Sequence, residues 1–473
     1  MKLYMGVDMG TSSTKAALMD ERGCVLSRVR LESSVISPEE GFFEVDAEGV
    51  WWKNFIAVCK KFFSGFDASS LRALCVSSVC GSFVPVDGAF RPVHNAILYG
   101  IDRRSESLVR DLNARYGEAF LKRRLGNAFS THSVLPKILW LKKSRPDVYA
   151  RTAHFVSSLN FITARLTGVP RWDVPTAHGA LMLDGETEAA PQWFLEDHGI
   201  ADGKIPPAAP AILPLGTVSR SAAAETGIPE GTPVMNGACD VNAEAMAVNA
   251  VMPGTAVAVF GSTLSIMLNT DAPHSLDGFM SGRSLFPEVW RIGAATASGG
   301  RTLDWGRALG AFSEAREPTG IYFIPYLDGA RSPFTNPSAT GAFLGLTSAH
   351  SPSDMARAVW ESLGYELAMI ISKMESAAPF PDVLETSGGL SNVPELMRLI
   401  ADITGRTLRP HPDVDASQGD AFIAMMSEIP YDRLPFSGQE LPLIRPDERA
   451  GHYAKHRARF QSLCEMLTAP GFL

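Results

Sequence analysis

Two hairpins of the same design, one at the N-terminus and one near mid-chain, limit the folds open to this sequence. In the first, an apolar strand at residues 3–7 leads through a Gly-Thr-Ser-Ser turn into a second apolar strand at 14–19. In the second, residues 255–260 and 264–268 flank the tight turn Gly261-Ser262-Thr263. Short apolar runs bounded by Gly and Ser are typical of hairpin strands. Their repetition predicts two lobes of duplicated architecture.

Helical segments lie between and after the hairpins. Apolar residues at helical spacing predict helices at 47–63, 135–143, 352–373 and 395–404. Ser351 and Pro352 stand where a helix cap and a first-turn proline belong, and Gly405 stands where a helix ends. Because strands and helices mix in both halves, we expect the α/β class.

The length of 473 residues is too great for one compact core, which predicts two domains. A turn rich in Pro and Gly at 228–233 precedes the second hairpin, so the boundary is expected close to Asp240. We therefore predict an N-terminal lobe at 1–243 and a C-terminal lobe at 244–473.

Charge and cysteine content argue against several classes of protein. The net charge is −8 and no long basic block is visible, which argues against a nucleic-acid partner. The six cysteines form no CxxC pair, so we expect reduced thiols. The chain has no run of about 18 apolar residues and no apolar stretch of signal-peptide length before Asp8. We expect a cytoplasmic protein with no membrane partner.

The first hairpin turn has the composition of a phosphate site. A carboxylate at a strand end, here Asp8, can hold a hydrated Mg²⁺ ion. Glycine and consecutive turn amides form an anion-binding nest, while hydroxyls and a lysine add donors and positive charge. An ordinary polar turn rarely combines all of these within eight residues. The residues of this candidate site are Asp8, Gly10, Thr11, Ser12, Ser13 and Lys15.

Three further segments carry candidate residues for nucleotide binding and proton transfer. Gly261, Ser262 and Thr263 offer a second phosphate turn, which alone would be an ordinary turn. Asp240 lies in an otherwise uncharged stretch that follows Gly237, where it can act as a general base or simply cap nearby amides. The residues at 386–392 place two glycines between a strand and a helix, which permits close approach of a flat ring or forms a plain loop.

Two loops are candidates for the substrate side. One, at 77–82, follows the predicted strand 71–76 and contains Cys80 and Gly81. The other, at 99–104, contains Tyr99, which can stack on a sugar, and Asp102, which can accept bonds from sugar hydroxyls. An ion pair between a loop aspartate and Arg103 is the alternative. P-loop, HExxH, GxSxG and GxGxxG patterns are absent from the sequence.

Taken together, these segments resemble the FGGY carbohydrate kinases, the group that contains xylulokinase, ribulokinase and glycerol kinase. The resemblance covers nearly the whole chain. It rests on GVDMGTSSTKAAL, GFFEVDAEGVWW, AILYGIDRRS, LTGVPRWDVPTAHGALMLD, NGACDVNAEA, FIPYLDGARSPF, GAFLGLTSAH and SGGLSNVPELMRLIADITGR, in that order.

The resemblance implies the actin-like ATPase fold, in which two ribonuclease-H-like lobes flank a deep cleft, and it implies ATP with Mg²⁺ as cofactors. It assigns the general base to Asp240, and the metal site to Asp8 with Asp240. It assigns ATP and phosphate binding to Gly10, Thr11, Ser12, Ser13, Lys15, Gly261, Ser262, Thr263, Gly300, Gly388, Gly389 and Asn392. Substrate binding falls to Cys80, Gly81, Tyr99, Asp102 and Asp240. A homodimer is expected at the level of the family.

The chain departs from the pattern of the family at several positions. Cys80-Gly81 replaces the Met-His of xylulokinases, and Tyr99 replaces a tryptophan, with one extra residue before Asp102. The other departures are Val393 and Arg398 in the adenosine motif, Ala247-Val248-Asn249 after Asp240, and Gly419-Asp420-Ala421 in place of Gly-Ala-Ala.

The function expected is ATP-dependent phosphorylation of a primary hydroxyl of a small sugar or polyol, with a ketose such as a pentulose favoured. The alternative is a nucleotide-binding sugar sensor or scaffold of the same fold with weak catalysis. The departures in the adenosine motif motivate the alternative. The Asp8, Thr11 and Asp240 set favours the kinase.

Overall fold

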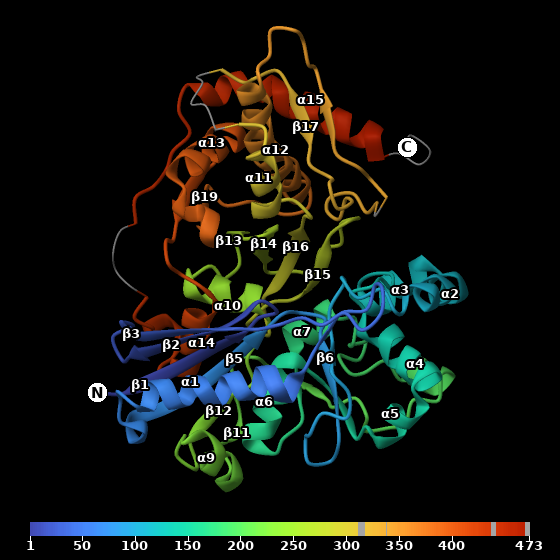
Figure 1. Cartoon of the computed structure of the whole chain (residues 1–473), viewed down its shortest axis with the longest axis vertical. Helices are drawn as coiled ribbons and strands as arrows, with labels where there is room; N and C mark the ends of the chain where they lie inside the picture. The colour runs from blue at the N-terminus through green and yellow to red at the C-terminus, as the bar shows by residue number, and fades with distance from the viewer. Residues whose placement is uncertain (311–316, 337, 437–440, 469–473) are drawn as a thin grey trace. The chain divides into compact units, whose positions relative to one another are not determined.

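The computed structural model describes residues 1–310, 317–336, 338–436 and 441–468 (Figure 1). Its contacts divide the chain into two compact units. The first comprises Met1–Asn249, Gly282–Glu288 and Asp415–Gly438, and the second comprises Ala250–Ser281, Val289–Val414 and Gln439–Leu473. These units differ from the predicted limits of 1–243 and 244–473, because two segments from the C-terminal half join the first unit.

The first unit is built on a six-stranded sheet in the order β11-β12-β5-β1-β2-β3. β1 pairs antiparallel with β2 and parallel with β5, and β5 in turn pairs parallel with β12. The predicted first hairpin is therefore confirmed. The bounds are β1 Leu3–Met9, β2 Ser13–Asp20, β3 Val25–Glu32, β5 Leu71–Ser78, β11 Pro214–Thr217 and β12 Pro233–Met235.

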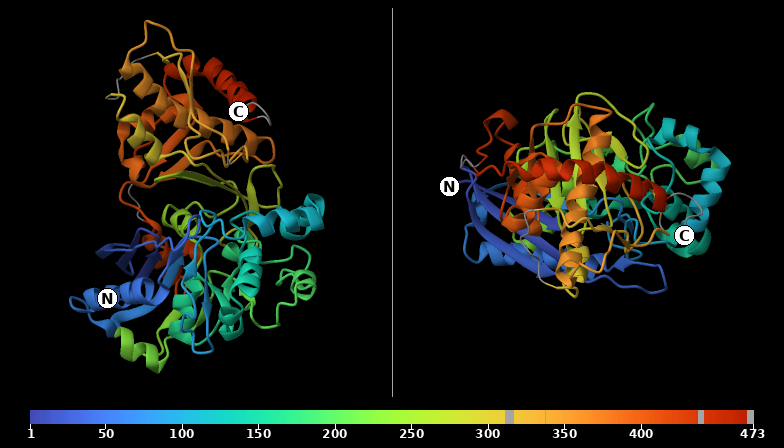
Figure 2. Two further views of the ribbon diagram at one scale, coloured as in Figure 1. Left: turned by 45° about the vertical axis from the view of Figure 1, so that its right-hand side comes forward. Right: turned by 90° about the horizontal axis from the view of Figure 1, so that it is seen from above.

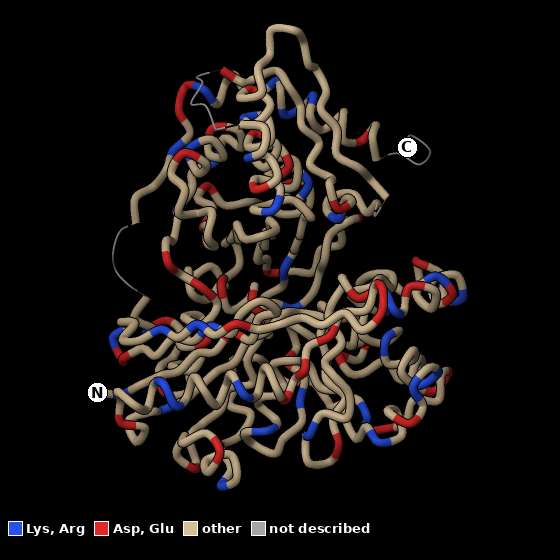
Figure 3. Tube along the Cα trace, in the orientation of Figure 1, with Lys and Arg blue, Asp and Glu red and all other residues tan. Residues whose placement is uncertain are grey.

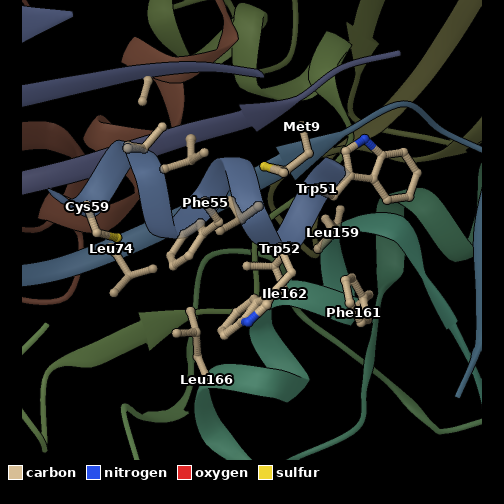
Figure 4. Packing of buried hydrophobic residues seen from close by; sticks show 14 of the residues in the cluster. Met9, Trp51, Trp52, Phe55, Cys59, Leu74, Leu159, Phe161, Ile162 and Leu166 are labelled. Atoms are coloured by element: carbon tan, nitrogen blue, oxygen red, sulfur yellow. The ribbon is translucent and has the colours of Figure 1, made fainter. Parts of the chain in front are cut away.

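The side chains of β1 alternate between two faces of the sheet, and the two faces have different neighbours. Because successive strand side chains point to opposite faces, the odd-numbered residues of β1 share one face. These residues pack in a core with the π-helical turn η1 (Ala47–Trp52), with α1 (Lys53–Phe63) and with α6 (Ser158–Thr167). Figure 4 shows this core from close by; its labelled members are Met9, Trp51, Trp52, Phe55, Cys59, Leu74, Leu159, Phe161, Ile162 and Leu166.

The even-numbered face of β1 is covered by α14 (Ala416–Met425), a helix from late in the chain. A β-carbon added to Gly6 would lie 1.9 Å from the Ser417 carbonyl oxygen, so the helix rests directly on the strand. A β-carbon added to Gly419 would lie 1.7 Å from the Ala243 carbonyl oxygen in α10 (Asp240–Ala247). Figure 1 shows α14, in red-orange, beside the blue strands β1 and β2. Asp8 belongs to this face.

The rest of the first unit surrounds a small four-stranded sheet in the order β4-β7-β6-β8 and has a separate apolar core. Figure 3 shows charges of both signs along its helices α2 to α5. The strands are β4 Glu44–Val45, β6 Phe83–Val86, β7 Ala96–Ile97, β8 His154–Ser157, β9 Trp172–Asp173 and β10 Ala208–Ala209. The helices are η2 Ala68–Ser70, α2 Glu106–Tyr116, α3 Glu118–Leu125, α4 Val134–Ser144, α5 Pro146–Arg151, α7 Val174–Gly179, α8 Gln192–Asp197, α9 Arg220–Thr226 and η4 Tyr431–Arg433.

The second unit repeats the pairing scheme of the first. Its sheet has the order β15-β16-β14-β13-β19-β20, with β13 antiparallel to β14 and parallel to β19. Figure 2 gives two further views of the ribbon. The predicted duplication of architecture is therefore confirmed. The strands are β13 Ala256–Phe260, β14 Leu264–Thr270, β15 Met280–Arg283, β16 Trp290–Ala295, β17 Tyr322–Ile324, β18 Ala342–Leu344, β19 Val383–Ser387 and β20 Thr407–Pro410.

The helices of the second unit are α11 Gly300–Gly306, α12 Pro352–Glu375, η3 Gly389–Asn392, α13 Pro394–Thr404 and α15 Arg449–Thr468. Two of them, α12 and α13, lie within two residues of the predicted limits 352–373 and 395–404. Ser351 caps α12 in a reciprocal box with Asp354, and Gly405 ends α13 in the left-handed conformation. All six cysteines are free, as expected. Within the described ranges, every helix is too short or too polar to span a bilayer.

Candidate active site

The first unit gathers its candidate residues where parallel strands end. β1, β5 and β12 run parallel, so their carboxyl ends lie at one edge of the sheet. Asp8 is the residue before the last of β1, and its register partner in β5 is Ser77. Ser78, at the end of β5, forms a parallel bridge with Cys239, the residue before Asp240. The topology thus brings Asp8, Ser77 and Asp240 to one place.

Asp8 is a buried carboxylate beside a lysine. It is 7% exposed, and its partner across the hairpin is Lys15. Burial raises the pKa of Asp8 to about 6, although the charge of Lys15 opposes the rise. The Ser77 hydroxyl lies 3.5 Å from Asp8 Oδ1. A carboxylate in such surroundings favours a nearby cation.

Asp240 is the first residue of α10, and its Oδ1 accepts a hydrogen bond of 2.8 Å from the amide of Val241. Burial raises the pKa of Asp240 well above its ordinary value, and the acidic groups of Cys239 and Asp8 raise it further. Two carboxylates that repel each other in this way form a donor pair that suits a divalent cation. No cluster of three or more His, Cys, Asp or Glu side chains able to hold a metal occurs in the described part of the chain. Mg²⁺ needs only one or two carboxylates when phosphates and water supply its other ligands.

The turn between β1 and β2 is stabilised by hydrogen bonds within the turn and from residues outside it. The Gly10 amide donates to the Ser13 carbonyl at 3.1 Å, and the Trp51 indole donates to the Gly10 carbonyl at 3.3 Å. The amide of Ser33 donates to the carbonyl of Ser12 at 3.0 Å. Thr11 remains partly exposed and Ser12 exposed. The predicted phosphate-binding residues of this turn therefore lie together, next to Asp8 and Lys15.

The two loops predicted to bind substrate are in contact through Gly81, which follows Cys80, and Tyr99. The Tyr99 amide donates to the Ser82 hydroxyl at 3.1 Å, which ties the second predicted loop to the first. A β-carbon added to Gly81 would lie 3.0 Å from the His132 carbonyl oxygen, and the rings of Tyr99 and His132 lie 5.9 Å apart. His132, which sequence reasoning missed, thus belongs to the same cluster. A single histidine in the polar stretch 130–133 gave no signal of this contact.

Asp102 is held in a buried network of hydrogen bonds and ion pairs. It is fully buried, and its Oδ2 accepts hydrogen bonds from the Phe43 amide at 2.7 Å and from Arg104 at 2.8 Å. Its Oδ1 accepts a further bond of 2.9 Å from Arg104, which also pairs with Glu44 at 2.8 Å. The ion-pair alternative therefore describes Asp102, with Arg104 in the place foreseen for Arg103. A role for Asp102 as a sugar ligand stays a prediction.

Lys137 is a second residue that sequence reasoning missed. It lies on α4 and is fully buried, and its Nζ donates to the carbonyls of Leu98 at 2.5 Å and Tyr99 at 2.8 Å. Burial lowers the pKa of Lys137 to about 7. A lysine within the apolar run PKILWL was the available signal, because a lysine in such a run needs buried partners. Lys137 thus holds the backbone at Leu98 and Tyr99 in place by hydrogen bonds.

The second unit gathers the other predicted nucleotide residues around the end of β13. The Gly261 amide donates to the Thr263 carbonyl at 3.0 Å, which repeats the closure at Gly10. The amide of Gly300 donates to the carbonyl of Gly261 at 2.9 Å, so α11 begins on this turn. A β-carbon added to Gly388 would lie 2.6 Å from the Phe260 carbonyl oxygen. Ser262 lies within this turn, and Gly389 and Asn392 follow Gly388 as exposed residues of η3.

Two α/β units with the same strand pairing, each carrying a Gly/Ser/Thr turn at the end of its first strand, define the actin-like ATPase fold. The N-terminal domain of the FGGY family of carbohydrate kinases matches residues 3–247, and the C-terminal domain of that family matches residues 256–428. The chain belongs to this family, and it is a carbohydrate kinase.

Similar proteins support the same class. The chain is 26% identical to the xylulose kinase of Escherichia coli (strain K12), over 98% of this chain and 99% of that protein. It is 24% identical to the gluconokinase of Bacillus licheniformis, over 85% and 83% of the two chains. The crystal structure of a ligand-bound xylulose kinase from Lactobacillus acidophilus has the same fold, with a TM-score of 0.89 over 99% of both chains at 22% identity.

Proposed function

We propose that this kinase transfers the γ-phosphoryl group of ATP to a primary hydroxyl of a small sugar or polyol, with a ketose such as a pentulose as the preferred class. The observation that carries the proposal is the convergence of Asp8 and Asp240 at the edge where β1, β5 and β12 end. Relatives named xylulose kinase and gluconokinase support a small polyhydroxylated acceptor.

Asp240 acts as the general base in this proposal. A sugar hydroxyl is far too weak an acid to attack phosphorus unaided at neutral pH, so a positioned carboxylate must accept its proton as the new bond forms. The raised pKa of Asp240 makes its carboxylate a stronger base than an exposed aspartate. The place of Asp240 at the start of α10 fixes its direction.

Each unit supplies its own candidate residues for ATP in this proposal. Phosphate binding is assigned in the first unit to Gly10, Thr11, Ser12, Ser13 and Lys15, and in the second unit to Gly261, Ser262, Thr263 and Gly300. Gly388, Gly389 and Asn392 would flank adenine. Mg²⁺, held by Asp8 and Asp240, would neutralise charge on the transferring group.

Cys80, Gly81, Tyr99 and His132 form the proposed sugar side. Cysteine and glycine stand at positions where xylulokinases carry larger side chains, so the site offers a different contour to the acceptor. The cytoplasmic location and the homodimer stay predictions.

An Asp240→Asn variant tests the assignment of the base. We expect turnover to fall by about a thousandfold or more, because removal of general-base catalysis costs about 10²–10⁴-fold. Sugar binding, measured by calorimetry, should survive. The Glu244→Gln change on the same helix, at a partly exposed position one turn away, is the matched control and should keep most activity. Normal turnover by Asp240→Asn would exclude the role.

The sensor alternative makes the opposite prediction for the wild-type protein. It requires ATP binding with no phosphorylated product from any sugar. Product formation at ordinary enzyme rates with a single acceptor would rule it out.

A further inference from the structure

Asp420 is a buried carboxyl group that the proposed chemistry leaves without a role. It lies on α14 and is fully buried. The close approaches at Gly6 and Gly419 press α14 against β1 and α10 at the same time. Asp420 is therefore placed between the strand that carries Asp8 and the helix that begins at Asp240.

A single hydroxyl connects Asp420 to Asp8. Ser77 Oγ lies 2.7 Å from Asp420 Oδ2 and 3.5 Å from Asp8 Oδ1. The arrangement follows from register, because Asp8 and Ser77 are paired residues of β1 and β5 and share the face that α14 covers. Cys75, two residues earlier on β5, places its sulfur 3.7 Å from Asp420 Oδ1.

The Ser77 hydroxyl lies between two carboxyl groups but has a single proton. A serine hydroxyl has one proton, so Ser77 can donate to only one of the two carboxyl groups. If Asp420 is neutral, its own O–H donates to Ser77 Oγ, and the Ser77 proton is free to turn to Asp8. Burial raises the pKa of Asp420 well above its ordinary value, and the nearby Asp8 adds to the rise.

We propose that Asp420 is a positioning residue that acts through the Ser77 hydroxyl to hold the Asp8 carboxylate in its metal-binding orientation. The inference rests on the proposed function, since it takes Asp8 as the carboxylate that organises Mg²⁺.

The test uses four variants of the full-length protein: Asp420→Ala, Asp420→Asn, Ser77→Ala and the Asp420→Ala/Ser77→Ala double variant. We expect Asp420→Ala to lower kcat about tenfold and to raise the half-saturating Mg²⁺ concentration several-fold, the loss typical of one charge-assisted hydrogen bond. KM for the sugar should change less than about twofold. Asp420→Asn should recover most of the loss, because its amide donates to Ser77 as a neutral carboxyl does. The double variant should be no worse than Ser77→Ala.

A second readout does not depend on turnover. The affinity for Mg·ADP, measured by calorimetry with and without Mg²⁺, should weaken in Asp420→Ala only when Mg²⁺ is present. Asp184→Asn is the matched control, since Asp184 is also a buried acid of the first unit, with Arg124 and Trp193 as partners. It should lower thermal stability while leaving kcat and the Mg²⁺ dependence as in the wild type.

Three outcomes would overturn the inference. The first is an Asp420→Ala variant with wild-type kcat and Mg²⁺ dependence. The second is an Asp420→Asn variant as impaired as Asp420→Ala, and the third is additive losses in the double variant. In each case an inactive Asp240→Asn variant would leave the proposed function standing. Absence of phosphoryl transfer by the wild-type protein would instead remove the proposed function itself.

Discussion

At the scale of single residues, the buried Lys137 side chain holds the backbone next to Tyr99 by hydrogen bonds. Changing Lys137→Met would remove the donor to the Leu98 carbonyl and would leave the Tyr99 carbonyl with the Asp102 amide alone. We expect the free energy of unfolding to fall by about 1–3 kcal/mol. KM for the sugar should rise while KM for ATP stays unchanged, because the loop carries Tyr99 and no predicted nucleotide residue.

Lys143→Met on the same helix is the control for this change. Lys143 is exposed, so its replacement should alter the free energy of unfolding by less than about 0.5 kcal/mol. Chemical denaturation measures both variants. Equal stabilities for the two would contradict the role given to Lys137.

The residue scale is also where the sequence alone was least decisive. Asp102 and Asp240 each follow a glycine by two or three residues in the sequence, and both were candidates for contact with the sugar. What separates them is a set of partners distant in sequence, because the Phe43 amide and Glu44 complete the network of Asp102 and Arg104. Side-chain partners of this kind are set by the tertiary fold, which local sequence does not reveal.

At the scale of elements, the packing of α14 on β1 depends on a missing side chain. Gly6→Ala would place a β-carbon within 1.9 Å of the Ser417 carbonyl oxygen, and backbone atoms of a helix cannot move aside cheaply. We expect the free energy of unfolding to fall by about 3 kcal/mol or more. Gly88→Ala is the control, because nothing lies within 4 Å of a β-carbon there. A Gly6→Ala protein as stable as Gly88→Ala would show that α14 does not rest on this strand.

Glu428, just after α14, links that helix to the sheet through hydrogen bonds and ion pairs. It accepts hydrogen bonds from Lys2 at 2.9 Å, from Tyr4 at 2.9 Å and from Arg72 at 2.6 Å. Partial burial works to raise the pKa of Glu428, but the bonds from Lys2, Arg72 and Tyr4 outweigh it and lower the pKa from 4.5 to about 2. The folded-state pKa is therefore below that of the unfolded chain.

The pH dependence follows from the sign of that shift. Stabilisation by Glu428 is present above pH 4.5 and is lost as the pH falls toward 2. Glu428→Gln should therefore lower the free energy of unfolding by about 1–3 kcal/mol at pH 7, after allowance for screening by solvent. Denaturant titrations at pH 7 and pH 3 should show the difference from wild type shrinking. A difference that stays constant with pH would contradict the assignment.

Individual elements were largely predictable from their own signals, whereas the place of α14 was not. The capping box at Ser351 and the terminal Gly405 are local, and so the limits of α12 and α13 could be predicted. The departure at Gly419-Asp420-Ala421 was visible in the sequence. Its meaning needed the contact of Gly419 with α10, which joins residues far apart in the chain.

At the scale of the whole molecule, the return of 415–438 to the first unit has a consequence for truncation. A fragment of residues 1–249 lacks the helix that covers the even-numbered face of β1. We expect this fragment to aggregate or to be cleaved rapidly by protease. Joining residues 415–438 to it through a flexible linker should restore protection. Equal protection of the two fragments would show that the first unit is complete without α14.

The duplicated plan of the molecule could be predicted because each lobe opens with its own hairpin and Gly/Ser/Thr turn. The limits of the lobes were predicted from one turn at 228–233. That turn carries no information on the later segments Gly282–Glu288 and Asp415–Gly438, which belong to the first unit. Interleaving of this kind is a property of tertiary contacts.

The central claim is that this protein phosphorylates a small sugar or polyol with ATP. The direct measurement is release of ADP by the purified protein in a coupled assay against pentuloses, hexuloses, aldoses, pentitols and glycerol. We predict strong ADP release that depends on one acceptor or a few related acceptors, that requires Mg²⁺ and that is abolished by Asp240→Asn. Release of no ADP above background with any acceptor, from protein shown to bind ATP, would contradict the claim.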